Sequence, residues 1–254
     1  MLHVSNLTKR YGHLTALSEV SFSIRPGEVL GLIGPNGSGK TTLFECLGGV
    51  LPADSGTIAE DGRTLTAAER KTRVFYLPDA IAPWPSQTVG WALDFITGFF
   101  GGQRPTTNDQ RPTTNDQRPT TNDVVRQLDL EPLLESPIGT LSKGQRKRAL
   151  LAIGLLTPQP ILLADEPFDG LDLRQTREIA QTLRAHAAGG RTMFLSIHQI
   201  NDASRVCDRF VLLSGGRVRG EGTLDELSRK AGQIRREGGQ PEGGDLEEVF
   251  LALT

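Results

Sequence analysis

A glycine-rich segment at residues 34–41, GPNGSGKT, carries the residue types that bind the phosphates of a nucleotide. It follows an apolar run at residues 29–33 and leads into a helix-like segment at residues 41–51, which is the strand–loop–helix context of a phosphate-binding loop. Glycines let backbone N–H groups approach phosphate oxygens, and the following helix contributes the positive end of its dipole. We therefore expect Lys40 to reach the terminal phosphates and the Thr41 hydroxyl to bind Mg²⁺.

Two adjacent carboxylates follow another apolar run, in ILLADEP at residues 161–167. Asp165 is placed to hold Mg²⁺, directly or through a water, and Glu166 to orient and deprotonate an attacking water. Neighbouring strand residues point to opposite faces, so both acids serve one site only if the strand ends there, as Pro167 indicates. A solvated strand end would show the same pattern in isolation, but the phosphate loop in the same chain favours the catalytic interpretation.

The segments around these motifs predict an α/β core. Apolar runs at residues 29–33, 161–164, 193–197 and 210–213 are typical of strands buried on both faces of a parallel sheet. An amphipathic pattern at residues 174–188 predicts a helix between two of them. Buried strands that alternate with helices imply a mainly parallel sheet.

The remaining patterns predict β structure at the start of the chain and helices in its middle. Apolar and polar residues alternate at residues 19–24, and Asp61-Gly62 is a hairpin-turn signal. Strand signals vanish between residues 85 and 157, so we expect a helical insert there. Its helices are predicted at residues 89–100, at 124–130 with Asp123 as N-cap, and at 143–156.

The heptapeptide QRPTTND occurs three times in tandem at residues 103–123, inside this insert. It contains no apolar residue, so it cannot bury a core or stack as a solenoid. We expect a disordered linker or an exposed loop. The repeat is either a duplication that the loop tolerates or a contact element for a partner protein, and the first interpretation is favoured.

Composition excludes several classes of protein. The chain has 254 residues, 37% of them hydrophobic, with 28 Lys and Arg against 30 Asp and Glu, which does not fit a globally basic nucleic-acid binder. The apolar runs are too short to cross a bilayer, and the N-terminus lacks a signal core. Cys46 and Cys207 are far apart in sequence, so we expect no disulfide framework and a cytoplasmic location.

The order of these motifs resembles that of the ATP-binding subunit of an ABC transporter, over nearly the whole chain. The family's signature LSGGQ corresponds to LSKGQ at residues 141–145, and its D-loop to FDGLD at residues 168–172. His198 follows an apolar strand where the family has its switch histidine, and Tyr11 matches the aromatic residue that stacks on adenine. Asp79, in YLPD, stands where the family has Gln or Glu.

The resemblance implies a P-loop NTPase (RecA-like) core with an N-terminal antiparallel β subdomain and an inserted helical subdomain. Residues 1–237 would form the ATPase domain, and residues 238–254 a linker and a C-terminal helical tail. The catalytic residues implied are Lys40, Glu166 and His198, and the metal ligands are Thr41, Asp165 and Asp79. The residues implied to bind ATP within one subunit are Tyr11, Gly34, Pro35, Asn36, Gly37, Ser38, Gly39, Lys40, Thr41 and Thr42. Those implied at the site of an opposing subunit are Ser142, Lys143, Gly144, Gln145 and, in a subunit contact, Asp172.

Several of these residues also have plain structural interpretations. Lys143, which replaces a signature glycine, either adds a cation near the γ-phosphate or faces solvent. Asp79 is one methylene shorter than Glu, so its metal contact either runs through water or is lost. The basic run at residues 146–148 is expected to be a solvated helix face rather than a nucleic-acid site. The alternative for Tyr11 is an aromatic residue of a loop that binds no ligand. The alternative for His198 is a histidine at a strand end whose hydrogen bonds are made within the protein.

By family resemblance, two such subunits, identical or not, pack head to tail around ATP and Mg²⁺ and drive a separate transmembrane permease. The chain would then lie on the cytoplasmic face of the membrane. The C-terminal DLEEVFLALT and the YLPD sequence resemble exporter ATPases, so export is favoured. The alternatives are a soluble ABC-class ATPase acting in cofactor assembly or repair, and an ATP-binding scaffold that has lost hydrolysis.

Overall fold

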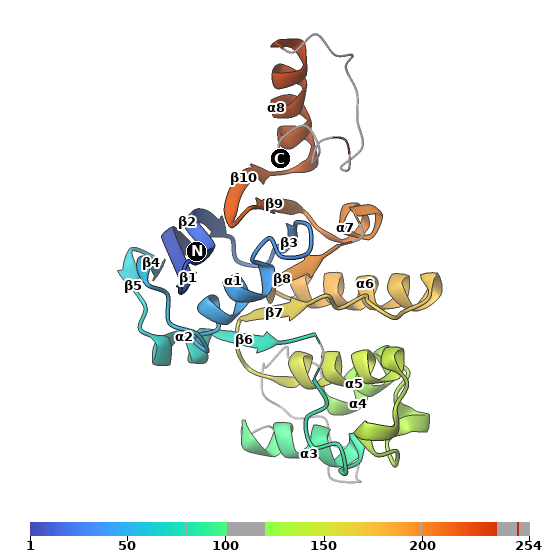
Figure 1. Ribbon diagram of the computed structural model, residues 1–254. Helices are drawn as coiled ribbons and strands as arrows, with labels where there is room; N and C mark the ends of the chain where they lie inside the picture. Colours follow the sequence, from blue (N-terminus) through green and yellow to red (C-terminus); the bar gives the residue numbers. More distant parts are fainter. Residues whose placement is uncertain (80, 101–119, 199, 238–247, 249–254) are drawn as a thin grey trace.

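The computed structural model describes residues 1–79, 81–100, 120–198, 200–237 and 248 of the chain. A small antiparallel sheet lies beside a larger, mainly parallel sheet, with helices around them (Figure 1). The small sheet has the order β2-β1-β4-β5 and consists of β1 (Leu2–Tyr11), β2 (Leu14–Ile24), β4 (Ser55–Glu60) and β5 (Arg63–Thr64). The large sheet has the order β10-β9-β3-β8-β7-β6 and consists of β3 (Val29–Ile33), β6 (Val74–Leu77), β7 (Ile161–Asp165), β8 (Thr192–Ile197), β9 (Arg209–Ser214) and β10 (Arg217–Gly222). The α-helices are α1 (Lys40–Leu47), α2 (Ala67–Arg73), α3 (Val89–Phe99), α4 (Thr121–Gln127), α5 (Lys143–Leu156), α6 (Leu173–Ala188), α7 (Ile200–Val206) and α8 (Leu224–Glu237).

β3 forms the centre of the large sheet and is buried on both faces. It pairs in parallel with β8 and β9. Val29 and Ile33 pack into the core that includes α6 and the helical insert, whereas Leu30 and Leu32 pack into the core that includes α1 and the small sheet. Because each face of β3 packs against a core, nearly all its residues are apolar. The buried strand holds the start of the phosphate loop in place.

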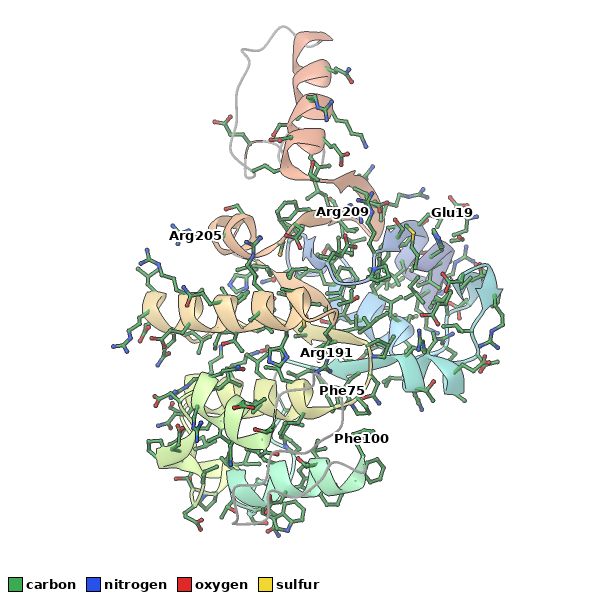
Figure 2. The ribbon with its side chains drawn as sticks, turned by 180° about the vertical axis from the view of Figure 1, so that it is seen from behind. Glu19, Phe75, Phe100, Arg191, Arg205 and Arg209 are labelled. Atoms are coloured by element: carbon green, nitrogen blue, oxygen red, sulfur yellow. The ribbon has the colours of Figure 1, made fainter. Side chains whose placement is uncertain are left out.

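Helices α3, α4 and α5 form the predicted helical insert between β6 and β7. The core holds the end of this insert through Arg191, which lies just before β8. Its guanidinium donates to the carbonyls of Leu155 at 2.6 Å and Gly154 at 2.8 Å, near the last turn of α5. Arg191 lies between the insert and α6 (Figure 2). A cation at the C-terminal end of a helix satisfies free carbonyls and complements the helix dipole.

The insert presents an exposed row of aromatic side chains, which we call the aromatic stripe. Its members are Trp84, Trp91, Phe95 and Phe99. Trp91, Phe95 and Phe99 follow one another at intervals of four residues on α3, so they lie on one helix face. The rings of Trp91 and Phe95 stack at 5.2 Å between centroids, and Phe99 is 71% exposed.

Several predicted boundaries need correction. α1 ends at Leu47 rather than near residue 51, because the chain turns at Gly49, where φ is +70° and a Cβ would lie 2.6 Å from the Ala67 carbonyl oxygen. α4 begins at Thr121 with Thr120 as its N-cap, and Asp123 completes a capping box at the third helical position instead of being the cap.

The tandem repeat and the predicted tail lie mostly outside the described residues. The last four repeat residues, 120–123, form the cap and first turn of α4, so the predicted disorder is wrong there. α8 projects from the end of the large sheet opposite the insert (Figure 1). None of the helices that the structure describes is long and apolar enough to span a membrane.

Candidate active site

Four neighbouring parallel strands bring the predicted functional residues to one edge of the large sheet. These strands are β3, β8, β7 and β6, in that spatial order. The phosphate loop follows β3, His198 follows β8, Glu166 follows β7, and Asp79 lies shortly after β6. Because the carboxyl ends of parallel strands share one edge, residues far apart in the sequence meet there.

Lys40 lies folded against the phosphate loop at the first position of α1. Its ammonium donates to the carbonyl of Gly34 at 2.9 Å and to that of Pro35 at 3.4 Å, and the residue is only 7% exposed. The Ser38 hydroxyl is buried and has no hydrogen-bond partner among the described residues. Asn36 and Gly37 are exposed at the tip of the loop. A buried ammonium and an unpaired hydroxyl beside exposed backbone fit a loop built to receive phosphate oxygens.

The glycines of the loop are required by its geometry. A Cβ on Gly34 would lie 2.2 Å from the Leu213 carbonyl oxygen, and one on Gly39 would lie 2.6 Å from that of Ala16. Gly37 has φ of +79° and open space beside it. The loop therefore stays narrow at its base and open at its tip, where a phosphate group can approach the backbone.

The predicted metal ligands Thr41 and Asp165 are in direct contact. The Thr41 hydroxyl donates to Oδ2 of Asp165 at 2.8 Å, although 124 positions separate the residues. The buried Ser196 hydroxyl donates to the other carboxylate oxygen of Asp165. Mg²⁺ prefers hydroxyl, carboxylate, water and phosphate oxygens, so this donor set fits a magnesium nucleotide.

Glu166 points into the same site because the strand ends in front of it. β7 stops at Asp165, and Glu166 takes the left-handed conformation, with φ of +50°. Its N–H donates to the hydroxyl of Ser196 at 3.0 Å. Its Oε2 lies 3.1 Å from Nδ1 of His198, which is partly exposed after β8. The structure thus meets the condition for both carboxylates to serve one site.

Asp79 binds an ammonium group in this structure. Lys147, whose side chain is 7% exposed, donates to Asp79 and, at 3.4 Å, to the carbonyl of Asp165. The prediction of a solvated face at residues 146–148 is therefore wrong for Lys147. Arg148 is also largely covered, and it donates to the backbone and side chain of Asp129.

Three acidic residues, which we call the acidic cluster, lie together at the mouth of the site, and each is paired with a basic one. Oxygens of Asp79, Glu166 and Asp169 lie within 4.8 Å of one another. The pairs are Asp79 with Lys147, Glu166 with His198, and Asp169 with Lys143. Hydrogen bonding to Lys143 lowers the pKa of Asp169, and the same contact raises the pKa of Lys143.

The signature segment forms the capped start of α5. The Ser142 hydroxyl accepts from the N–H of Gln145 at 3.3 Å, and Gln145 accepts from the N–H of Ser142 at 2.9 Å. Asp172 caps α6 in the same way, through the N–H of Gln175 at 2.8 Å. We call residues 141–145 the signature turn. Among the described residues, its hydrogen bonds go to α5, to the preceding residue Ile138 and to the 168–172 loop, and not to the phosphate loop.

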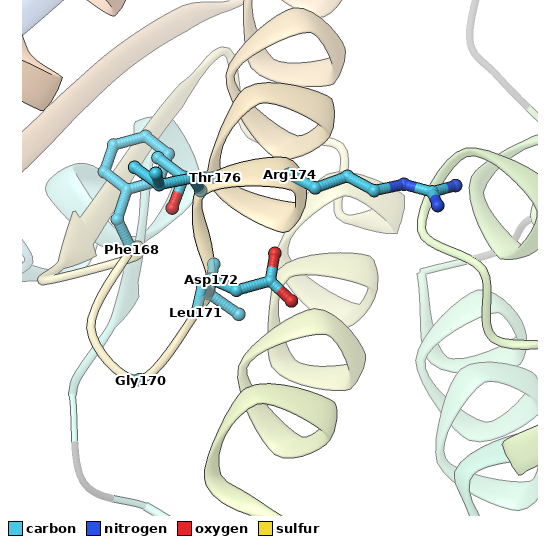
Figure 3. A pocket seen from close by; sticks show the side chains of 7 residues that line it. Phe168, Gly170, Leu171, Asp172, Arg174 and Thr176 are labelled. Carbon is cyan, nitrogen blue, oxygen red and sulfur yellow. The ribbon is translucent and has the colours of Figure 1, made fainter.

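A hollow beside the start of α6 is lined by the 168–172 loop and the first turn of that helix. Its lining residues are Phe168, Gly170, Leu171, Asp172, Leu173, Arg174 and Thr176. The Asp172 carboxylate lies at the start of the helix, and Arg174 extends away from Phe168 (Figure 3). Leu173 is 71% exposed.

Tyr11 lies at the end of β1 and is 46% exposed. Its register partner is Leu14 across the hairpin, and the Lys9 ammonium lies 5.7 Å from the centre of its ring. The same hairpin continues to Ala16, whose carbonyl faces Gly39 of the phosphate loop. The structure therefore leaves the Tyr11 ring exposed enough to stack on a flat group.

Comparisons with known proteins agree with this geometry. The sequence profile described as ABC transporter matches residues 17–169. The chain belongs to the ABC transporter family. It is 33% identical to the Nod factor export ATP-binding protein I of Ralstonia nicotianae, over 89% of this chain and 68% of that protein.

Solved structures show the same fold. The solved structure of an ATP-binding subunit of an ABC transporter is similar, with a TM-score of 0.80 at 28% identity, over 100% of this chain and 99% of the other. A dimeric ATP-binding cassette in a post-hydrolysis state, bound to ADP and Pi, gives 0.71 at 25% identity, over 88% and 99%. The chain is thus an ABC ATP-binding cassette with the P-loop NTPase α/β fold.

Three residues of this site were not identified from the sequence. Ser196 contacts both Asp165 and Glu166, Lys147 contacts Asp79, and Asp169 belongs to the acidic cluster. A polar residue inside the apolar segment FLSIH was the available signal for Ser196. Lys147 lies in a run of three basic residues, and the sequence does not distinguish a buried member of such a run from exposed ones.

Proposed function

We propose that this chain is the ATP-hydrolysing subunit of an ABC transporter and that it drives a separate membrane permease. The observation that carries the proposal is the meeting of Lys40, the Thr41–Asp165 pair and the Glu166–His198 pair at one sheet edge. This arrangement offers a phosphate-binding cation, oxygen ligands for a metal, and a carboxylate base within one site.

Each group has a separate task in the proposed hydrolysis. Lys40 and the loop N–H groups bind the β- and γ-phosphates of ATP. Thr41 and Asp165 would hold Mg²⁺, which neutralises charge on the phosphate oxygens. Glu166 accepts a proton from the attacking water, and His198 orients the carboxylate of Glu166. Tyr11 stacks on the adenine ring.

The proposed site is completed by a second subunit packed head to tail. In a single chain, the described hydrogen bonds of the signature turn do not include the phosphate loop. The N-terminus of α5, with Ser142 and Gly144, is suited to bind the γ-phosphate of ATP held by the opposing chain. The dimeric cassette with ADP and Pi supports this arrangement.

We assign the permease contact to the aromatic stripe. An exposed row of stacked aromatic rings is unusual on a protein without a partner, and the family supplies a membrane partner. The similarity to an export ATP-binding protein supports export as the direction. The chain would then lie on the cytoplasmic face of the membrane, attached through the permease.

Phosphate release by the wild type and by Glu166→Gln tests hydrolysis. We expect the variant to retain ATP binding and to lose at least about 100-fold in kcat, because the base is replaced by a group that cannot accept the proton. Equal rates in the two proteins would contradict the proposal. Co-expression with a multi-helix membrane protein encoded beside this chain tests the coupling, and failure to recover the two proteins together would contradict it.

A further inference from the structure

Lys143 joins the start of α5 to the 168–172 loop. Its ammonium lies 2.5 Å from Oδ2 of Asp169. Its methylene groups cross Gly170 so closely that a Cβ there would lie 2.7 Å from Cδ and 2.8 Å from Cγ of the lysine. A Cβ on Gly144, the next residue of α5, would lie 3.0 Å from the Gly170 carbonyl oxygen. The two segments are therefore packed together, with the ion pair at their edge.

Asp169 in turn is bonded to the loop that carries Glu166. The N–H of Asp169 donates to the carbonyl of Glu166 at 3.2 Å, closing a tight turn directly after β7. The carboxylates of the two residues belong to the acidic cluster, with oxygens within 4.8 Å. A displacement at the start of α5 can thus reach Glu166 through two consecutive contacts.

We propose that Lys143 is a positioning residue that makes the signature turn and the Glu166 loop of one chain move together. This inference rests on the proposed function, in which the signature turn binds ATP held by the opposing subunit. A nucleotide bound there displaces the start of α5, and Lys143 passes this displacement through Asp169 to Glu166 in the chain's own site. The two ATP sites of a pair of subunits are thereby coupled.

The sequence is specialised for this link at two positions. Lys143 occupies a place where the signature LSGGQ has glycine, which has no side chain to reach Asp169. Gly170 has φ of +82°, and any side chain there would be strained and would displace the lysine stem. Asp169 precedes Asp172, the N-cap of α6, by three residues, and it pairs with the first residue of α5.

Hydrogen exchange of the nucleotide-free protein tests the link directly. The variants are Lys143→Ala, Asp169→Asn, the double variant, and the charge exchange Lys143→Asp with Asp169→Lys. We expect each single change to speed exchange two- to fivefold in both segments 142–146 and 168–172, about the effect of one exposed ion pair. The double variant should be no faster than either single one, and the charge exchange should restore protection. Additive effects, or effects confined to the mutated segment, would overturn the proposal.

Arg63→Ala is the matched control for the loss of a surface ion pair. The Arg63 side chain is 70% exposed and lies 2.6 Å from Glu69, whereas that of Lys143 is 61% exposed with its partner at 2.5 Å. The control should leave exchange at residues 142–146 and 168–172 unchanged. A control effect as large as that of Lys143→Ala would also overturn the proposal.

The consequence for coupling is measured in the Glu166→Gln background, where ATP is bound but not cleaved. With ATP and Mg²⁺, sedimentation should show subunit association weakened two- to fivefold by Lys143→Ala and by Asp169→Asn. Unchanged association in both variants would overturn the coupling. If the Glu166→Gln parent itself did not associate, the proposed two-subunit site would be wrong, and the exchange data would still decide whether the link exists.

Discussion

At the scale of single residues, the proposed hydrolysis depends on a local change of backbone direction at Glu166. A left-handed conformation is uncommon for residues other than glycine, and here it turns a side chain that would otherwise leave the site toward His198. Ser196 stabilises this turn by bonding the Glu166 N–H and the carboxylate of Asp165. One buried hydroxyl therefore orients both acidic groups.

Replacing Ser196 tests this role. Ser196→Ala should lower kcat about tenfold and raise the Mg²⁺ concentration for half-maximal activity, because partners that orient ligands typically contribute at this level. ATPase rates across a Mg²⁺ titration measure both effects. A normal Mg²⁺ dependence in Ser196→Ala would contradict the assignment.

Thr182→Val is the matched control for the loss of a buried hydroxyl. Thr182 is buried on α6, and its hydroxyl donates to the carbonyl of Glu178 in the same helix at 3.0 Å. Valine keeps the shape of the side chain and removes only this bond, which lies outside the acidic residues of the site. The control should leave the Mg²⁺ dependence unchanged, and a shift as large as that of Ser196→Ala would show that the effect is not specific to Ser196.

The Asp79–Lys147 pair predicts unequal effects of its two partners on stability. Asp79→Asn leaves the ammonium of Lys147 buried beside a carbonyl and should lower the free energy of unfolding by about 1–3 kcal/mol. Lys147→Met removes the buried charge, and Asp79, 35% exposed, can be hydrated. The Met variant should therefore be the more stable of the two in urea denaturation, and the opposite order would contradict the interpretation of this pair.

At the scale of secondary-structure elements, the helical insert meets the core where α4 faces α6. His186, in the last turn of α6, lies 3.3 Å from the side-chain oxygen of Gln127 at the end of α4. Burial, together with the charge of Arg191, lowers the pKa of His186 to about 4. The imidazole is therefore neutral in the folded protein at neutral pH.

This shift predicts acid destabilisation. An unfolded chain protonates His186 near pH 6.5, so it binds more protons than the folded chain between that pH and about 4. Stability should be fully present above pH 6.5 and should fall as the pH drops toward 4. Thermal unfolding at pH 7 and pH 5 should show a smaller loss for His186→Gln than for the wild type. Equal losses would contradict the prediction.

If the aromatic stripe binds the permease, substitutions in it should weaken recruitment of the chain to the membrane and leave its ATP hydrolysis unchanged. Phe95→Ser and Phe99→Ser should weaken recovery of the chain with membranes that contain the permease, because they remove exposed apolar contacts. ATP hydrolysis without the permease should not change. Val50→Ser is the control, since Val50 is 64% exposed just after α1. Recovery that falls equally in all three variants would argue against the stripe as the contact.

The fold could be predicted where burial is two-sided. β3, β7 and β8 are fully buried, so nearly every position must be apolar or small, and the sequence pattern is continuous. β1 was not predicted as a separate strand because register shifts interrupt its burial pattern. β6 was not predicted because it has only four residues, two of them partly exposed. The domain boundary expected near residue 237 stays a prediction.

Candidate site residues could be predicted where one segment carries the chemistry. The phosphate loop and the Asp165–Glu166 pair are local motifs, and their spacing is fixed by one loop or one strand end. Lys147, which bonds Asp79, is 68 positions away on α5. Ser196, which bonds Asp165, is 31 positions away on β8. Such contacts depend on strand order and helix packing, which a single sequence does not specify.

At the scale of the whole molecule, the proposed function assigns two different nucleotide-binding surfaces to one chain. The sheet edge offers the phosphate loop, the metal ligands and Glu166, and the start of α5 offers a capped helix N-terminus linked to Asp169. Because no described hydrogen bond joins the start of α5 to the phosphate loop of the same chain, two chains would complete two sites. ATP that contacts both chains then stabilises the association of the two subunits.

The central claim is that the phosphate loop binds ATP as a magnesium complex and that the chain cleaves it. Calorimetric titration of ATP into the wild type and Lys40→Ala, followed by phosphate release from the same samples, tests it most directly. We expect Lys40→Ala to bind ATP at least about 10-fold more weakly and to release almost no phosphate. A Lys40→Ala protein that bound and cleaved ATP as well as the wild type would contradict this claim.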